Sequence, residues 1–500
     1  MAHAGIDGGH EPPRGGDAGG PRRLLVPAAL VIVLVAAGVI VAPRLFSGPA
    51  ATPSAVPTAP GSPSAVAELG SPTPGATGAA TGPNPSPAAA TSAHDPRRIA
   101  VVDAAGALST TDDAGGPVTP YPQPGIVFGF PAWSPDGTRV AVVGYGPSET
   151  SIYVFAARAG GAATPPDPVV IYRSTESPPF YLYWMPDGRQ IAFLATEGTG
   201  ISLRIAPADG SAPLDGSGPG SVVRRGAPLY YDWAGAGRLL LHVGLGTGSF
   251  TGEVGIDGAA AAPEITGTGD YRTAGISRDG RFIAYARSAT GPEGAVVVAA
   301  RNGTSHHDMP VFGPAAFDFD PAGDIVATIG ADKPVTGAPA FPVGPLRLMD
   351  PETGAVRTLL GGSVVAFFWA PDGRTIATLS LVQGGPTADA GVTLARAAPV
   401  ASLAPPATPL PGADIGLAFV DVATGTVRSQ RVVRLGDHFI AELLPYFDQY
   451  ALSHRIWSSD GAAILLPLVD ETGRTTIDEV PADGTSIRAI ADGVSAFWSP

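Results

Sequence analysis

The chain has 500 residues, including 67 glycines and 54 prolines, and its 30 Lys and Arg against 44 Asp and Glu give a formal net charge of −14. Such an acidic chain lacks the clustered basic side chains that neutralise phosphates, so we expect no nucleic-acid partner. It contains no cysteine, which excludes a disulfide framework, a thiolate metal site and a cysteine nucleophile.

An apolar segment near the N-terminus predicts a membrane anchor. The 19 residues Leu24–Ala42 carry no charge, and they would form a helix of about 28 Å that can span the hydrocarbon core. Three arginines lie in the preceding arm, residues 1–23, whereas only Arg44 follows closely. This bias places the arm in the cytoplasm and the rest of the chain outside it. We therefore expect a single-pass protein of the cytoplasmic (plasma) membrane; the alternative is a cleaved signal peptide, whose apolar core is usually shorter.

Residues 43–96 are predicted to form a disordered linker. Between residues 47 and 93 almost every residue is Pro, Ala, Ser, Thr or Gly, and Glu68 is the one charged side chain. Such a stretch cannot bury enough apolar surface to form a core, and it should adopt extended conformations of the polyproline II type. It would hold the following domain away from the membrane surface.

From residue 97 onward one pattern recurs, in which an apolar strand ends at an anchor residue, usually aromatic, and a tight turn leads into a second apolar strand. The best-formed copies read Trp-Ser-Pro-Asp-Gly or Trp-Ala-Pro-Asp-Gly. In such turns Pro presets φ, Asp bonds to its own backbone, and Gly supplies the positive φ. We therefore interpret these aspartates as turn residues and not as catalysts. The anchors are Trp133, Trp184, Trp233, Ile276, Phe319, Trp369, Trp457 and Trp498.

The spacing of the anchors predicts a β-propeller. Successive anchors are separated by 51, 49, 43, 43, 50, 88 and 41 residues, and about 40 to 50 residues is typical of a four-stranded blade. The long gap contains residues 383–411, a Pro/Ala-rich insertion that we expect to be disordered. Residues 97–500 should therefore form an all-β domain of eight four-stranded blades, or seven if one weaker copy is not independent.

The two ends of this domain complement each other. Residues 98–102, 107–110 and 117–120 read as three strands of a blade that lacks its innermost strand. Residues 495–499 would supply that strand. Closure of this kind leaves a propeller with few exposed strand edges.

The repeated Trp-Ser-Pro-Asp-Gly-x-x-[Ile/Val]-Ala pattern resembles the TolB-like repeats, also called PD40, of bacterial periplasmic propellers. The resemblance covers residues 97–500 and implies a WD40-like β-propeller on the extracytoplasmic side of a bacterial membrane. Ala236 and Ala322 depart from the pattern by replacing the turn aspartate. Because one propeller fold serves adaptors, hydrolases and lyases alike, the resemblance assigns no activity.

The common catalytic signatures are absent from the sequence. It contains no G-x-S-x-G elbow, no G-x-x-x-x-G-K-[ST] loop and no H-E-x-x-H pair. His306 and His307 are adjacent on a predicted outer strand, so their rings should point to opposite faces and not share an ion. We therefore predict no catalytic residue, no metal site and no cofactor. A lyase remains an alternative because of His242 and His454, since similar propeller lyases use metal-bound histidines near the central channel.

The most unusual segment lies just before Trp457 and is rich in aromatic and polar residues. Segments that enter an innermost strand pass the mouth of the central channel, where propeller ligands usually bind. The candidates for ligand binding are Tyr446, Asp448, Tyr450, His454 and Arg455. The alternative is that the aromatic residues cap the bottom of the blade.

These patterns favour a noncatalytic binding or scaffolding module near the membrane, for an unknown protein, peptide or envelope glycan. One alternative is a propeller enzyme, such as a metal-dependent polysaccharide lyase or hydrolase that uses the channel mouth. Another is a propeller that only assembles a larger envelope complex.

Deleting residues 1–46 should yield a soluble protein with the far-ultraviolet circular dichroism of an all-β domain, because the predicted anchor is removed and the predicted propeller is left whole. Deleting residues 1–23 alone keeps the apolar segment and should leave the protein dependent on detergent. An insoluble or strongly helical product of the longer deletion would contradict this architecture.

Overall fold

The computed structural model describes residues 97–500, apart from residues 115, 158–166, 218–220, 236, 246–247, 263, 270, 289–293, 335–340 and 383–411. The predicted cytoplasmic arm, membrane span, linker and insertion all lie outside the described residues. None of the helices in the described part of the chain is both long and apolar enough to cross a bilayer.

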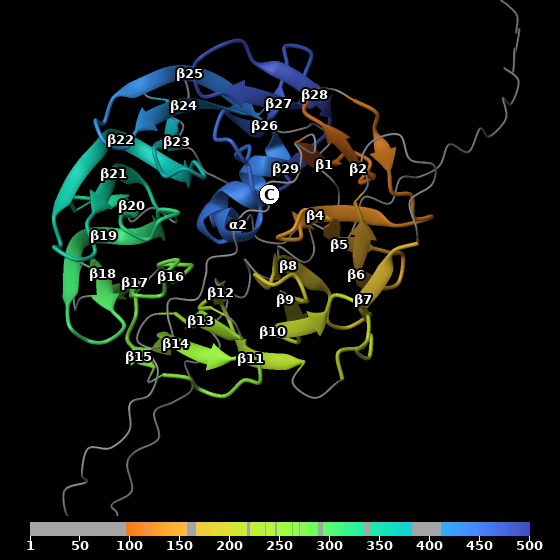
Figure 1. The fold of residues 1–500 in the computed structure, drawn as a ribbon, viewed down its shortest axis with the longest axis horizontal. Helices are drawn as coiled ribbons and strands as arrows, with labels where there is room; N and C mark the ends of the chain where they lie inside the picture. Colours follow the sequence, from red (N-terminus) through yellow and green to blue (C-terminus); the bar gives the residue numbers. More distant parts are fainter. Residues whose placement is uncertain are drawn as a thin grey trace, which may run out of the picture.

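The described strands form a ring of sheets around a central axis (Figure 1). Neighbouring strands within the sheets run antiparallel. Each group of strands runs from the axis to the rim, which is the arrangement of a β-propeller. The prediction of an all-β fold is therefore confirmed.

Blades 1 to 3, numbered along the chain, are separate four-stranded sheets. In each of them the strands follow one another in chain order from the axis to the rim (Figure 1). The strands are β4 (Val127–Trp133), β5 (Arg139–Tyr145), β6 (Thr150–Ala156) and β7 (Val169–Ser174); β8 (Pro179–Trp184), β9 (Gln190–Glu197), β10 (Gly200–Pro207) and β11 (Val222–Gly226); and β12 (Leu229–Trp233), β13 (Arg238–Val243), β14 (Phe250–Gly255) and β15 (Ile265–Thr266).

Blades 4 to 7 belong to one continuous sheet of thirteen strands. Two 14-residue strands, β19 (His306–Phe319) and β22 (Val356–Trp369), each serve as the rim of one blade and the innermost strand of the next. In blade 7 a single bridge between Trp457 and Ile464 marks the innermost position. The other strands are β16 (Gly275–Ile276), β17 (Phe282–Ser288), β18 (Gly294–Ala300), β20 (Val326–Ala331), β21 (Gly344–Met349), β23 (Thr375–Leu381), β24 (Ala413–Asp421), β25 (Val427–Leu435), β26 (Ala463–Val469), β27 (Thr475–Pro481) and β28 (Arg488–Asp492).

Blade 8 joins the two ends of the domain. Its innermost strand β29 (Ser495–Trp498) pairs with β1 (Arg98–Val102), and β2 (Leu108–Asp112) and β3 (Thr119–Pro120) complete the sheet. The closing pair that the sequence predicts is therefore present. The described strands fall into eight blades.

Indole N–H groups of the anchors join neighbouring blades. The Trp184 indole donates to the Ala132 carbonyl at 2.9 Å, and Ala132 directly precedes the anchor of blade 1. Trp133 and Trp457 make the same bond to the blade before them, each at 3.0 Å. In these three cases the acceptor lies at the same repeat position, so the indole fixes the spacing of the two blades that it joins, whereas Trp233 Nε1 and Trp498 Nε1 have no hydrogen-bond partner among the described residues.

Arginines cover two of these indoles. Arg98 lies over the Trp133 ring, 5.3 Å from its centroid, and donates to the Gly137 carbonyl. Arg139 makes both contacts at the next blade, 4.7 Å from the Trp184 ring centroid. A guanidinium over an indole face is a favourable cation–π contact. Each arginine thus ties one blade to both the anchor and the turn of the next.

The first turn shows the chemistry that its sequence predicts. The Asp136 carboxylate accepts a hydrogen bond from the Thr138 backbone N–H at 3.0 Å, and Gly137 has a φ of 65°. That left-handed conformation is strained for any residue with a Cβ. Gly137 therefore permits the conformation of the turn, and Asp136 stabilises it.

Removing residues 495–500 should strongly lower the free energy of unfolding, because β1 then loses its only partner on the inner side and Trp498 leaves the core, where it is 1% exposed. Loss of a buried Trp alone typically costs about 3–5 kcal/mol. Urea unfolding measures the change. Removing only Ser499 and Pro500, which lie beyond β29, is the control and should cost much less. Equal stability of the two shortened chains would contradict closure by β29.

Candidate functional site

The central channel is occupied by residues 439–453, which we call the plug segment (Figure 1). It consists of a π-helical turn η2 (Phe439–Leu443), a 3-10 turn η3 (Leu444–Tyr446) and a short helix α2 (Phe447–Ser453). The helix contacts strands β8, β12, β19 and β22, which come from different blades. The plug segment therefore connects blades on different sides of the channel.

The plug segment is helical because its apolar residues share one face. Phe439, Leu443, Phe447 and Tyr450 follow one another at spacings of four, four and three, which is the helical period. All four are buried in the main hydrophobic core. Pro445 has no N–H and cannot continue the backbone bonding of η2 into α2, which accounts for the break between the helical turns.

Gln449 completes the inner edge of blade 3. Its side-chain amide donates to the Tyr231 carbonyl at 2.8 Å and accepts from the Tyr231 N–H at 3.1 Å. These are the two bonds that a neighbouring strand would otherwise make. The Tyr181 hydroxyl of blade 2 donates to the Gln449 carbonyl at 2.7 Å. One buried residue of the plug segment thus binds the backbone of one blade and a side chain of another.

Two aromatic residues adopt a strained backbone to reach the plug segment. Phe130 and Tyr181 have φ of 58° and 48°, and both lie where their innermost strand shifts register. The Phe130 ring stacks on Tyr450 at 5.5 Å, and Tyr181 packs edge-on against Tyr450 at 5.4 Å. Positive φ is uncommon for residues with a Cβ and persists only where the surroundings enforce it. The channel lining of blades 1 and 2 is therefore shaped around this plug.

Four of the five predicted ligand-binding residues take part in the packing of the plug segment. Asp448, Tyr450 and His454 are at most 8% exposed, and Tyr446 is half-buried beneath a guanidinium. Of the five, Arg455 keeps an exposed side chain. Binding of a ligand by these residues stays a prediction, and Arg455 is the member with surface available for it.

Burial determines the charge state of the channel histidines. It lowers the pKa of His454 to about 3, and His454 Nδ1 lies 2.6 Å from the Ser453 hydroxyl. Burial lowers the pKa of His242 to about 4, and its ring stacks on Tyr271 at 3.8 Å. Both imidazoles are therefore neutral at physiological pH. Among the described residues no group of three or more His, Cys, Asp or Glu is placed to hold a metal ion.

Two further carboxyl groups belong to the channel wall. Asp232 and Asp318 directly precede the anchors of blades 3 and 5, and Gly275 holds the same position in blade 4 between them. Burial raises the pKa of Asp232 to about 7, although it accepts bonds from the Trp233 N–H at 2.7 Å and the Tyr183 hydroxyl at 3.2 Å. Burial also raises the pKa of Asp318, and the Asp232 carboxylate raises it further. The two acids are therefore electrostatic neighbours across a glycine.

Two arginines beside the channel, at the side of the Asp-Gly turns, are close enough for their charges to interact. Arg278 lies in the turn of blade 4, Arg455 precedes the innermost position of blade 7, and both are exposed. Desolvation by the surrounding blades lowers the pKa of Arg455; Tyr183 of blade 2 opposes this change and the charge of Arg278 adds to it. Blades 2, 4 and 7 are not neighbours in the ring. Groups from all three can therefore act on one another only across the channel.

Asp232, Asp318 and Gln449 are important channel residues that sequence reasoning missed. The acids did leave a signal, because the other residues that precede an anchor are Ala132, Tyr183, Gly275, Phe368, Ile456 and Phe497. None of these is acidic. Gln449 left no comparable signal, since its partner Tyr231 lies 218 residues earlier in the chain.

Comparison with known proteins adds fold-level likeness. No family model matches the chain, and no curated protein matches it. A solved structure of a putative TolB from Agrobacterium tumefaciens is 12% identical, with a TM-score of 0.33, and the match covers 68% of this chain and 88% of that one. Dihydro-heme d1 dehydrogenase NirN in complex with DHE is 11% identical, with a TM-score of 0.48, covering 81% and 75%.

An oligogalacturonate lyase in complex with manganese is also similar. It is 11% identical, with a TM-score of 0.38, and the match covers 56% of this chain and 80% of that one. The three proteins differ in activity, and their scores and identities are low. We therefore base the fold on the strand pairings and draw no functional conclusion from these structures.

The free energy of unfolding of the wild type should fall as pH rises, because Asp232 loses its proton, and replacing Asp232 with Asn should abolish this fall. The folded-state pKa of Asp232 is about 7, against about 3.9 in an unfolded chain. The folded protein therefore binds the extra proton between these values, and its free energy of unfolding falls as pH rises through them. Between pH 5 and pH 8 the neutral Asn variant should gain on the wild type by roughly 3 kcal/mol, at about 1.4 kcal/mol for each of the two pKa units between pH 5 and the folded-state pKa. Urea unfolding at pH 5 and pH 8 measures the difference.

Asp209→Asn is the control whose effect should not change between pH 5 and pH 8. Asp209 is exposed, and hydrogen bonds from Ser211 lower its pKa, so its contribution to stability is present at high pH and lost as pH falls. Because that change is confined to pH values below about 4, the stability difference between this variant and the wild type should be the same at pH 5 and pH 8. The same histidines are present in all three proteins, so their titration contributes equally to each free energy of unfolding and does not affect the differences between the proteins. A constant stability difference between Asp232→Asn and the wild type would contradict a buried acid with a raised pKa.

Proposed function

We propose that this protein is a membrane-anchored, extracytoplasmic propeller of the TolB-like, PD40 type. In this proposal it acts as a noncatalytic binding or scaffolding module for a protein, a peptide or another envelope component. The Leu24–Ala42 segment supplies the anchor and residues 43–96 supply the tether. The propeller supplies the binding surface at the turn side of its channel.

The use that the plug segment makes of its own polar groups supports a noncatalytic role. Gln449 binds the backbone of Tyr231, and the Asp448 carboxylate lies 3.5 Å from the Thr273 N–H. His454 is enclosed by aromatic rings, with the Phe497 ring at 4.7 Å. Gln449 is thus used to hold the blades together, and Asp448 and His454 are enclosed by them, although Asp448 Oδ1 and His454 Nε2 have no hydrogen-bond partner among the described residues.

The two exposed arginines are the observation that supports a binding surface at the channel mouth. Arg278 and Arg455 are exposed and close enough for the charge of one to lower the pKa of the other. The chain as a whole has a net charge of −14, so this positive pair stands out locally. Guanidinium groups bind carboxylates through paired hydrogen bonds. We therefore expect the partner to present an acidic group to the channel mouth.

One observation favours an enzyme as the second candidate. Asp232 and Asp318 are neighbouring carboxyl groups with raised pKa values, and such pairs serve as acid and base in many active sites. A polysaccharide lyase or hydrolase would use them in this way. Asp232 is, however, only 6% exposed, which restricts access to it.

The test compares proteins cross-linked to the tagged full-length chain in its native membrane. The wild type is compared with the double variant Arg278→Gln/Arg455→Gln, and Arg374→Gln is the control, because Arg374 is an exposed arginine after the turn of another blade. We expect a partner that the wild type and the control retain and that the double variant loses by about tenfold, as removal of charge-assisted bonds predicts. Equal recovery by all three would overturn binding at the channel mouth.

The enzyme alternative has its own measurement. The purified full-length chain is incubated with uronate-containing polysaccharides, with and without divalent metal ions, and release of shortened chains is followed. Turnover that disappears in Asp232→Asn and persists in Asp209→Asn would replace the binding proposal by a catalytic one. No turnover would leave the binding role as the better account.

A further inference from the structure

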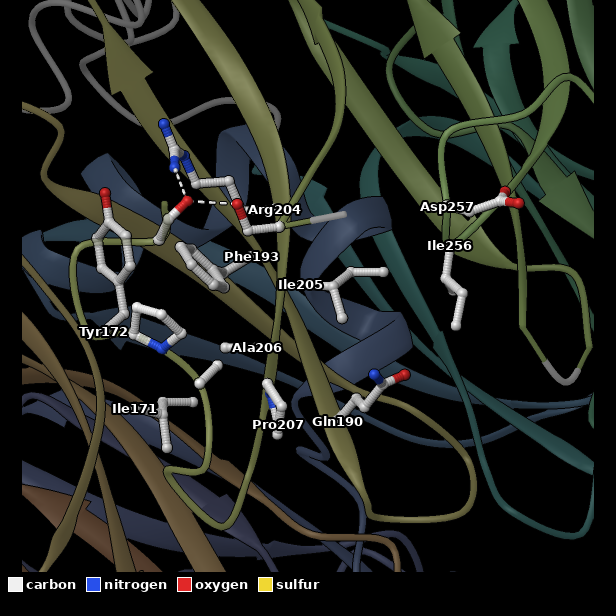
Figure 2. A pocket seen from close by; sticks show the side chains of 14 residues that line it. Ile171, Tyr172, Gln190, Phe193, Arg204, Ile205, Ala206, Pro207, Ile256 and Asp257 are labelled. Carbon is white, nitrogen blue, oxygen red and sulfur yellow. Dashed lines mark hydrogen bonds between the residues drawn. The ribbon is translucent and has the colours of Figure 1, made fainter. Parts of the chain in front are cut away.

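A second candidate site lies away from the channel, near the rim between blades 1 and 3. It is a pocket of about 300 Å³ built mainly by blade 2, which is at the lower end of the range for small-molecule sites. Figure 2 shows Arg204 and Tyr172 on one side and Asp257 on the other, with Ile205 and Ile256 between them. These residues come from three successive blades, so the pocket depends on their assembly.

Arg204 is a buried cation with donors to spare. Its side chain is 9% exposed, and its Nε donates to the Ser202 hydroxyl at 3.0 Å. Its two terminal nitrogens have only long contacts in the described part of the chain: 3.5 Å to the Gly216 carbonyl and 3.9 Å to Glu197. Glu197 is held by Arg225 instead, at 2.9 and 3.1 Å. Because buried charges normally have a close counter-ion, this arrangement points to an anionic ligand.

The orientation of Arg204 is fixed before any ligand arrives. The Tyr172 ring lies beneath the guanidinium, 5.8 Å from its centroid, and the Tyr172 hydroxyl is itself held by the Ser177 carbonyl at 2.9 Å. Ser202 holds the guanidinium from the Nε side. A planar, pre-oriented fork matches the two oxygens of a carboxylate. Little side-chain entropy would then be lost on binding.

The chain contains an internal comparison for this residue. Arg204 pairs with Phe193, the ninth residue after the anchor Trp184, and Arg347 pairs with Thr328, the ninth residue after the anchor Phe319. The two arginines therefore hold the same position in blades 2 and 5. Arg347 is also buried, but it does not line this pocket. It offers a matched control for the loss of a buried arginine.

The walls of the pocket restrict the ligand further. Arg204 is the one positive charge among the described residues that line it, and the walls near it are apolar: Ile171, Phe193, Ile205, Pro207 and Ile256. A dianion such as inorganic phosphate would be only half neutralised, and Asp257 would repel a second negative group. An apolar body with one carboxylate satisfies both constraints.

We propose that this pocket binds a small organic monocarboxylate, with its carboxylate on the Arg204 guanidinium and its apolar body against Ile205 and Ile256. The same chemistry is presented by a free carboxylic acid and by the C-terminal residue of a peptide. This site is separate from the channel mouth, so it can hold or fail independently of the proposed function.

The test measures binding to the full-length wild-type chain by ligand-observed nuclear magnetic resonance. The probes are hexanoate, 1-hexanol, hexylamine, inorganic phosphate, acetyl-Ala-Leu and the amide of acetyl-Ala-Leu. We expect hexanoate to bind at least about tenfold more tightly than hexanol, as one charge-assisted interaction predicts, and hexylamine and phosphate not to bind. Tight binding of acetyl-Ala-Leu but not of its amide would identify a peptide C-terminus as the source, whereas preference for hexanoate would identify a free acid.

Three variants connect the binding to the pocket. Arg204→Gln should weaken hexanoate binding about tenfold or more, Arg347→Gln should leave it unchanged, and Asp257→Asn should leave it unchanged or tighten it. Equal binding of hexanoate and hexanol by the wild type, or full binding by Arg204→Gln, would overturn the proposal. If Arg204→Gln does not fold, the wild type alone tests the proposal. A preference for hexanoate over hexanol and hexylamine would then support it, and the lack of such a preference would overturn it.

Discussion

The contact on which the ring depends is the packing of each anchor residue against the blade before it, and in blades 1, 2 and 7 the anchor indole also donates a hydrogen bond to a backbone carbonyl of that blade. At Trp184 this bond measures 2.9 Å and its acceptor, the Ala132 carbonyl, is buried. A buried carbonyl must find a donor, and a large flat ring is well suited to the space between two sheets. Where it forms, the bond therefore fixes the distance and the orientation of two successive blades.

The plug segment follows from the same geometry. A ring of eight blades leaves the inner edges of its innermost strands facing one another, and these edges carry unpaired backbone groups. Gln449 satisfies such groups at Tyr231, while aromatic rings fill the space around it. The channel is thus stabilised at its centre by side chains, where strands cannot reach. What stays accessible is the turn side, with its two arginines.

Much of the fold was predictable from the sequence because the repeat is local. The anchor, the Asp-Gly turn and the following strand lie within about a dozen residues. Each blade can therefore be recognised in the sequence independently of the other blades. The channel was far less predictable. The interaction of Asp232 with Asp318 joins blades 3 and 5, which are not consecutive in the chain, and the role of Gln449 depends on a strand more than two hundred residues away. The helical form of residues 439–453 was not predicted, because the segment attracted attention only through its aromatic and polar residues.

Closure of the ring through blade 8 has a consequence for how the chain is made. Arg98 and Ser495 are 397 positions apart, so β1 leaves the ribosome long before β29 exists. During that interval β1 has a free inner edge, and free edges invite pairing with foreign strands. Contacts between such distant residues also form slowly. The domain must therefore keep its earliest strand out of wrong pairings until residues 495–498 have been made.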